Sequence, residues 1–99
     1  MKKIVKAQIT WIKYENGGRK NPPLAGTRYC PIVIFNKIKG ETGEIWSADF
    51  ICTEVDENLR SIVEFTFLSE DAPINCLVKR NQFELFEGNK KVASGVIIE

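Results

Sequence analysis

The sequence contains no histidine, so its 99 residues lack the side chain that most often moves protons near neutral pH. Serine–histidine and cysteine–histidine nucleophiles and histidine-bound metals are excluded together. No G-x-x-x-x-G-K-[ST] loop is present to hold the phosphates of a nucleotide. The adjacent carboxylates Asp56-Glu57 and Glu70-Asp71 lie in turn-like stretches, where acids are usually solvated. We therefore expect a protein that is not an enzyme and that uses no cofactor.

The sequence also lacks a run of about 18 apolar residues that could cross a membrane. Its basic N-terminus is followed by no apolar segment of the signal-peptide kind. The three cysteines are Cys30, Cys52 and Cys76. They form no disulfide framework, and without histidine or a Cys-x-x-Cys pair they form no zinc site. Since each lies in an apolar stretch, we expect three buried, reduced and slowly reacting thiols in a cytoplasmic protein without a metal.

The charged residues are nearly balanced in number but unevenly distributed along the chain. The net charge is +1, which argues against a strongly basic nucleic-acid binder. Residues 1–39 hold nine lysines and arginines and one acidic residue, whereas residues 40–75 hold nine acidic residues and one arginine. Either the two segments form separate patches of opposite sign, or the folded strands interleave and their fields cancel.

Alternation of apolar and polar residues is the main positive signal. Gly- and Pro-containing stretches at 14–23, 39–43 and 69–73 separate the alternating segments. Six or seven short strands joined by turns predict one all-β domain over residues 1–99, built as a closed antiparallel barrel. The expected strands cover residues 5–11, 29–35, 45–52, 61–67, 83–87 and 92–98. The expected core contains Ile9, Trp11, Val33, Phe50, Val63, Phe65, Phe83 and Val96.

One segment carries two competing patterns. Thr53 begins it as a helix N-cap would, and the spacing of Val55, Leu59 and Ile62 suits a helix across residues 54–62. The β-rich sequence from Ile62 onward instead favours a turn followed by a strand. We expect the turn and strand.

Two stretches of the sequence resemble a known family. Residues 17–28 read GGRKNPPLAGTR, and residues 83–97 read FELFEGNKKVASGVI. Both resemble the third, C-terminal β-barrel domain of elongation factor Tu, whose patterns are roughly G-G-R-[HK]-x-P-[FI]-x-x-G-[YF]-R-P and F-x-[IL]-R-E-G-x-[RK]-T-V-[GA]-x-G-x-[IV]. The stretches occur in the same order and span nearly the whole chain. Tyr29 stands where the family has proline, and Phe86 where it has arginine.

This resemblance implies a Greek-key barrel that performs no chemistry. In elongation factor Tu the domain binds the T-stem backbone of aminoacyl-tRNA and docks on other proteins. The resemblance carries three basic loop residues, Arg19, Lys20 and Arg28, and the turn Glu87-Gly88 over to this chain as an RNA- or partner-binding site. It implies a non-catalytic binding module that contacts RNA phosphates or a translation-associated partner. From the residues alone, the three cations either bind phosphate or tie down their own loop.

A second function class fits the acidic central segment. A protein-interaction domain, such as an inhibitor or an immunity-type protein, would bind a basic partner through an acidic patch. The candidate residues for that patch are Asp56, Glu57, Glu70 and Asp71. Both classes need a protein or RNA partner and neither needs a nucleotide or a membrane.

Overall fold

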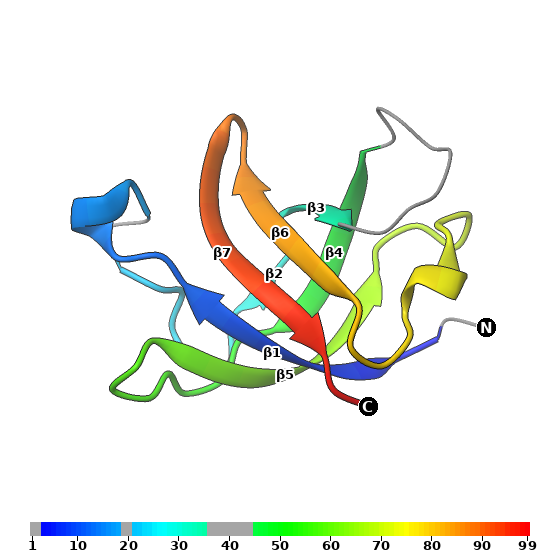
Figure 1. Ribbon diagram of the computed structural model, residues 1–99, viewed down its shortest axis with the longest axis horizontal. Helices are drawn as coiled ribbons and strands as arrows, with labels where there is room; N and C mark the ends of the chain where they lie inside the picture. The colour runs from blue at the N-terminus through cyan, green and yellow to red at the C-terminus, as the bar shows by residue number, and fades with distance from the viewer. Residues whose placement is uncertain (1–2, 19–20, 36–44) are drawn as a thin grey trace.

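Seven β-strands form the molecule in the computed structural model, which describes residues 3–18, 21–35 and 45–99. Two short 3-10 helices lie between strands, and the described residues contain no α-helix (Figure 1). The elements are β1 (Val5–Trp11), η1 (Tyr14–Asn16), β2 (Arg28–Tyr29), β3 (Ile32–Phe35), β4 (Trp46–Ile51), β5 (Arg60–Phe67), η2 (Ile74–Cys76), β6 (Gln82–Glu87) and β7 (Lys90–Ile97).

The strands close into a barrel, as the alternating pattern predicts. Around the ring β3 pairs with β4, β4 with β5, β5 with β1, β1 with β7, β7 with β6 and β6 with β3, always antiparallel. Three consecutive strands, β3, β4 and β5, are followed by β6, which returns beside β3, and this order is a Greek key. The extra strand β2 also pairs with β4. It uses the same register as β3, which follows it along the chain.

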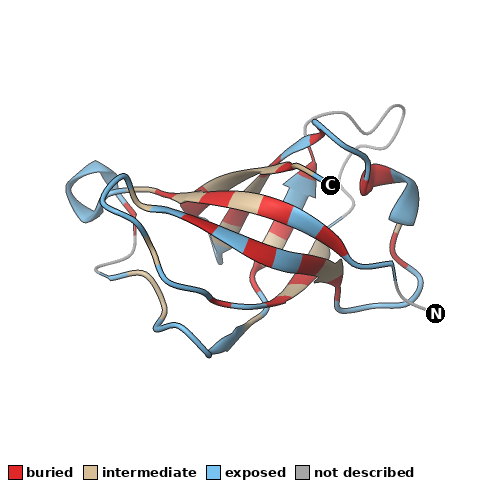
Figure 2. Ribbon diagram, turned by 90° about the horizontal axis from the view of Figure 1, so that it is seen from below, coloured by how far each residue is buried: buried red, intermediate tan, exposed pale blue. Residues whose placement is uncertain are grey.

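Alternating side chains divide the barrel wall into an inner and an outer face. Val5, Ala7, Ile9 and Trp11 of β1 are buried, and Lys6 between them is exposed. The eight residues of β5 follow the same rule, with every second side chain buried. Figure 2 shows this alternation as bands along the strands. A strand that is apolar on one face forms because the pleat turns successive side chains to opposite sides.

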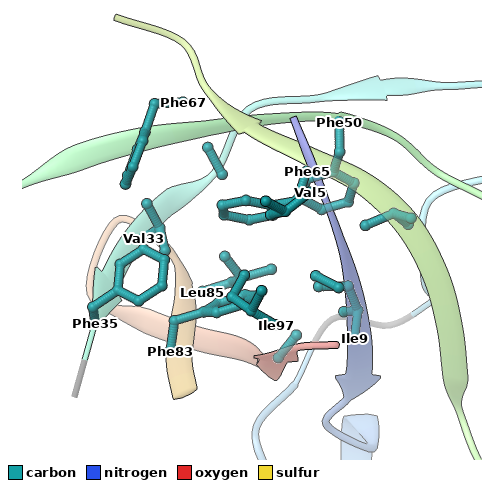
Figure 3. Packing of buried hydrophobic residues seen from close by; sticks show 14 of the residues in the cluster. Val5, Ile9, Val33, Phe35, Phe50, Phe65, Phe67, Phe83, Leu85 and Ile97 are labelled. Atoms are coloured by element: carbon teal, nitrogen blue, oxygen red, sulfur yellow. The ribbon is translucent and has the colours of Figure 1, made fainter. Parts of the chain in front are cut away.

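Phenylalanine rings fill the centre of the barrel (Figure 3). The ring of Phe65, fully buried, lies 4.8 Å from that of Phe83 and 5.9 Å from that of Phe50, centroid to centroid. Phe35 and Phe67 also contact it, each with its centroid 6.3 Å away. One aromatic side chain therefore connects strands on opposite sides of the ring.

Seven of the eight predicted core residues are buried, and Val96 is the exception. A β-bulge causes the error. Leu85 pairs with Ala93 but Phe86 pairs with Lys91, so Val92 is an extra residue in β7. Beyond the bulge the inward positions are Ala93, Gly95 and Ile97, which leaves Val96 half-buried on the outer side.

The segment before β5 is a turn, so the expectation of a turn followed by a strand is confirmed. The Asp56 carboxylate accepts hydrogen bonds from the backbone N–H groups of Asn58 and Arg60, at 2.8 and 2.9 Å. Leu59 has a φ of 62°, a left-handed value that ends any helical continuation. The strand then begins at Arg60. A helix across 54–62 does not form because the side chain of Asp56 satisfies these backbone donors locally.

Candidate functional site

The two stretches that carry the family resemblance meet at one groove. We call it the loop groove; it has a volume of about 760 Å³ and is lined by residues 21–25, residues 53–55, Glu87 and Lys90. The Tyr29 hydroxyl donates a hydrogen bond to the Glu87 carboxylate. Gly88, with a φ of 60°, takes the first central position of the β6–β7 turn, where a type II′ turn needs glycine. Arg19 and Lys20, both predicted site residues, lie outside the described residues.

Arg28, the third predicted cation, does not line the loop groove. Its Nε and Nη2 atoms each lie 2.9 Å from a carboxylate oxygen of Asp49, a bidentate ion pair. This hydrogen-bonded pair raises the pKa of Arg28 above its ordinary value. Tyr29, the next residue, points inward, where its ring packs 5.7 Å from those of Trp11 and Phe50. The strand therefore holds Arg28 on the outer face, away from Glu87.

The four acidic candidates do not form one patch. Asp56 and Glu57 precede β5, whereas Glu70 and Asp71 follow it, so the eight residues of the strand separate the two pairs (Figure 1). At about 3.3 Å per residue, the strand is more than 20 Å long. Asp56 also has a structural role in its turn. The pKa of its carboxylate is lowered, and the largest cause is the hydrogen bond from the backbone N–H of Arg60.

Basic and acidic segments of the sequence meet in the folded barrel. Lys6 of β1 lies opposite Glu64 of β5, and Arg28 pairs with Asp49. Lys6 also lies 3.4 Å from Glu99, with both side chains exposed. Among the described residues, basic and acidic side chains from the two segments therefore form local pairs. These pairs support interleaved strands rather than two separate patches of opposite sign.

An opening in the barrel wall is the feature that sequence analysis missed. The ladder between β4 and β5 consists of two residue pairs, Ala48 with Phe67 and Asp49 with Thr66. Past these pairs the strands separate, until the Thr53 hydroxyl donates a hydrogen bond of 2.8 Å to the Ile62 carbonyl. The opening between these two closures, which we call the wall slot, has a volume of about 580 Å³.

Isoleucines surround the wall slot on the outer face. Ile4, Ile51 and Ile62 are 60%, 51% and 45% exposed, and all three line the slot. The sequence does contain a sign of this surface. Ile51 and Ile62 occupy positions that the alternation assigns to solvent, where a polar residue is the usual choice.

The prediction of three buried thiols is wrong for Cys30. Cys52 and Cys76 are buried, but Cys30 is exposed. Alternation from β2 into β3 places Tyr29 and Pro31 inward, which turns Cys30 outward beside Asp49. Its thiol donates to an Asp49 carboxylate oxygen at 3.6 Å. Partial burial, followed by the negative charge of Asp49, raises the pKa of Cys30.

This geometry predicts how Cys30 reacts. An aromatic disulfide reagent should label one thiol in the native protein and three after denaturation. Because the raised pKa keeps Cys30 protonated near neutral pH, native labelling should be slow and should accelerate with pH. Asp49→Asn removes the negative charge and should accelerate labelling several-fold at pH 7.5, while Asp71→Asn should leave the rate unchanged. Slower labelling in Asp49→Asn would show that the charge of Asp49 does not hold this pKa up.

Comparisons with known proteins add no relative. No protein-family model matches the sequence, and no curated protein matches it. Within the described ranges, no three histidine, cysteine or acidic side chains group as metal ligands would, and no helix is long and apolar enough to cross a membrane. Three features of the described barrel are candidate sites: the loop groove, the wall slot and the ion pair between Arg28 and Asp49 that borders the slot.

Proposed function

We propose that this chain is a non-catalytic protein-binding module, built on a barrel of the kind found at the C-terminus of elongation factor Tu. The observation that carries the proposal is the group of half-exposed isoleucines, Ile4, Ile51 and Ile62, on one stretch of the outer wall. An apolar patch rimmed by charged residues is typical of a surface that another molecule covers. Here the rim is formed by Lys6, Arg28 and the acids opposite them.

The barrel topology and the loop groove support the resemblance. The chain forms a closed Greek-key barrel, and its loop residues 21–25 lie at the same groove as the turn after β6. Both are arrangements that the resemblance implies. In elongation factor Tu this domain acts by binding tRNA and by docking on other proteins, and neither role needs a catalytic residue.

Charge favours a protein over RNA as the partner. An RNA backbone binds where cations are free to replace counterions. Arg28 is already held by Asp49, and Glu54 and Glu87 bring two carboxylates to the loop groove beside Lys90. A partner that is held mainly by apolar contact does not need unpaired cations.

Affinity capture with and without ribonuclease tests the proposal. The immobilised barrel should retain a protein whose recovery survives ribonuclease, and the purified partner should bind it directly in calorimetry. In parallel, fluorescence anisotropy with a tRNA at low salt should show no binding at about 100 μM barrel, a concentration within the range of non-specific RNA binding.

The RNA function predicts a different set of results. The tRNA would bind, log affinity would fall with log salt at a slope of about −2 to −3 for three phosphate contacts, and Arg19→Glu would weaken it. Those results, or capture that ribonuclease abolishes, would overturn the protein-binding proposal.

A further inference from the structure

The indole N–H of Trp11 is a buried hydrogen-bond donor. Trp11 is 5% exposed, and within residues 3–18, 21–35 and 45–99 no atom accepts a hydrogen bond from its Nε1. Buried polar atoms in folded proteins nearly always have a partner, because burial removes the hydration that they have in the unfolded chain. A donor in this state is satisfied when a molecule from outside supplies the acceptor.

Trp11 lines a small cavity at the end of β1. We call it the Trp11 cavity; it has a volume of about 220 Å³. The side chain of Trp11 belongs to the inner face of the strand, and its ring packs 5.7 Å from that of Tyr29. Beyond Trp11 the chain turns through η1, and the Gly18 N–H donates to the Lys13 carbonyl at 3.0 Å. This closed turn places Lys13 and Tyr14 in the lining of the cavity.

The lining combines apolar walls with a cation. Ile12, Pro22 and Leu59 supply apolar surface, and Lys13 supplies the positive charge. None of the described residues that line the cavity is acidic, and in the described part of the chain Lys13 forms no ion pair. A hydrogen bond from a neutral donor is stronger when the acceptor is an anion, and a neighbouring cation adds to that preference. The polar part of the lining therefore favours a negatively charged acceptor.

The volume and the apolar walls define the rest of the ligand. Sites for drug-sized molecules usually have about 300–1,000 Å³, so this cavity takes a smaller molecule. Inorganic phosphate has no apolar part that would contact the walls, whereas a short hydrocarbon chain does. We propose that the Trp11 cavity binds a carboxylate on a short aliphatic body, with the carboxylate accepting the hydrogen bond from Trp11 Nε1 beside Lys13. A free organic acid and the C-terminal residue of a peptide both present this group.

The two sources differ in the space that they need. Asn21 and Pro22 line both the Trp11 cavity and the loop groove, so the two openings adjoin. A C-terminal residue in the cavity needs the rest of its peptide to lie along that groove, whereas a free acid needs only the cavity. Glu54 and Glu87, the acids of the groove, do not line the cavity.

The indole resonance of Trp11 reports directly on the hydrogen bond. 3-Methylbutanoate is titrated into the ¹⁵N-labelled barrel at constant ionic strength, and Trp46, the other tryptophan, is the internal control. A Trp46→Phe sample assigns the two indole signals. The Trp11 Nε1–H proton should move downfield with a dissociation constant on the order of 1 mM, while the Trp46 signal stays in place.

Two comparison probes test the charge and the apolar body. 3-Methylbutanamide, the neutral isostere, should bind about fivefold more weakly or worse. Inorganic phosphate should not move the Trp11 signal. Equal binding of the amide and the carboxylate would overturn the assignment. So would a Trp11 signal that stays in place at about 20 mM 3-methylbutanoate, well above the expected dissociation constant, because water would then be the acceptor.

Three variants locate the carboxylate. Trp11→Phe keeps an aromatic ring without the N–H and should weaken binding about tenfold, followed at the backbone amides of Tyr14 and Leu59. Lys13→Gln should weaken binding about two- to fivefold, as for an exposed ion pair. Lys79→Gln is the control and should leave binding unchanged, because Lys79 is exposed and follows η2, at the other end of the molecule from η1 (Figure 1). Unchanged binding in Lys13→Gln, which alters an exposed side chain and should fold, would contradict the assignment even if Trp11→Phe does not fold.

A dipeptide distinguishes the two sources. N-acetylglycyl-leucine carries the same carboxylate and aliphatic body at a peptide C-terminus. Tighter binding than 3-methylbutanoate, with shifts also at the amides of Leu24 and Ala25, supports the site and identifies a peptide C-terminus as its ligand. Weaker binding supports the site for a free organic acid. Ile62→Glu alters the isoleucine surface of the proposed function and should leave both titrations unchanged, so the two proposals fail separately.

Discussion

Phe65→Ala should destabilise the barrel by about 3–5 kcal/mol, the usual cost of removing a fully buried phenylalanine ring. Phe65 is fully buried, and its ring contacts four other phenylalanine rings from strands around the barrel. A domain of this size has about 5–15 kcal/mol of total stability, so one such loss removes a large share of it. Thermal unfolding should show a Tm lower by about 15–30 °C.

Two companion variants separate the cavity from general damage to β5. Phe65→Leu retains much of the volume and should cost clearly less than alanine. Glu64→Ala changes the exposed neighbour on the same strand and should stay within about 0.5 kcal/mol of wild type in urea unfolding. If the midpoint urea concentration for unfolding of Phe65→Ala equals that of the wild type, the aromatic cluster does not hold the barrel together.

Gly95→Ala should cost about 1–3 kcal/mol by overpacking. A Cβ atom at this position would lie 2.3 Å from Cζ and 2.5 Å from Cε1 of Phe83, closer than atoms approach. The ring cannot easily move aside, because Phe83 is buried and its centroid is only 4.8 Å from that of Phe65 and 5.2 Å from that of Phe35. Urea unfolding measures the loss.

A double-mutant cycle identifies the clash as the cause. Phe83→Leu removes the atoms that the new Cβ meets, so adding Gly95→Ala to it should cost much less than in the wild-type background. Ser94→Ala, the adjacent position on the outer side, should be nearly neutral. Strictly additive losses for Gly95→Ala and Phe83→Leu would show that the glycine is needed for a different reason.

Most of the fold could be predicted because each strand needs only a local pattern. In β1 every second residue is apolar, and in β5 Val63, Phe65 and Phe67 alternate with outward residues, so one buried face fixes which side chains turn inward. The pattern becomes ambiguous in β7, where Val92, Ala93, Val96 and Ile97 are all apolar. There the bulge at Val92 sets the phase, and a bulge depends on pairing with β6 that the sequence of β7 does not show.

The candidate site was less predictable, because it depends on where strands separate. The sequence identified Arg28 as a cation, but the partner that occupies it, Asp49, lies 21 residues away. The acidic residues looked like one group along the chain and lie at both ends of β5 in space. The wall slot arises from the loss of pairing between β4 and β5, whereas the exposed Ile51 and Ile62 could have been noticed as apolar residues at outward positions.

The position of β1 in the ring has a consequence for how the protein is made. Both neighbours of β1, the strands β5 and β7, are synthesised after it. A ribosome adds about 5–20 residues per second, so roughly 50 further residues, and 3–10 s, separate β1 from the start of β5. During that interval an alternating strand with Val5, Ile9 and Trp11 on one face has two unpaired edges. The edge of β1 that faces β7 stays unpaired until Lys90–Ile97 has also been made, so β1 is open to aggregation from its own synthesis until the barrel closes.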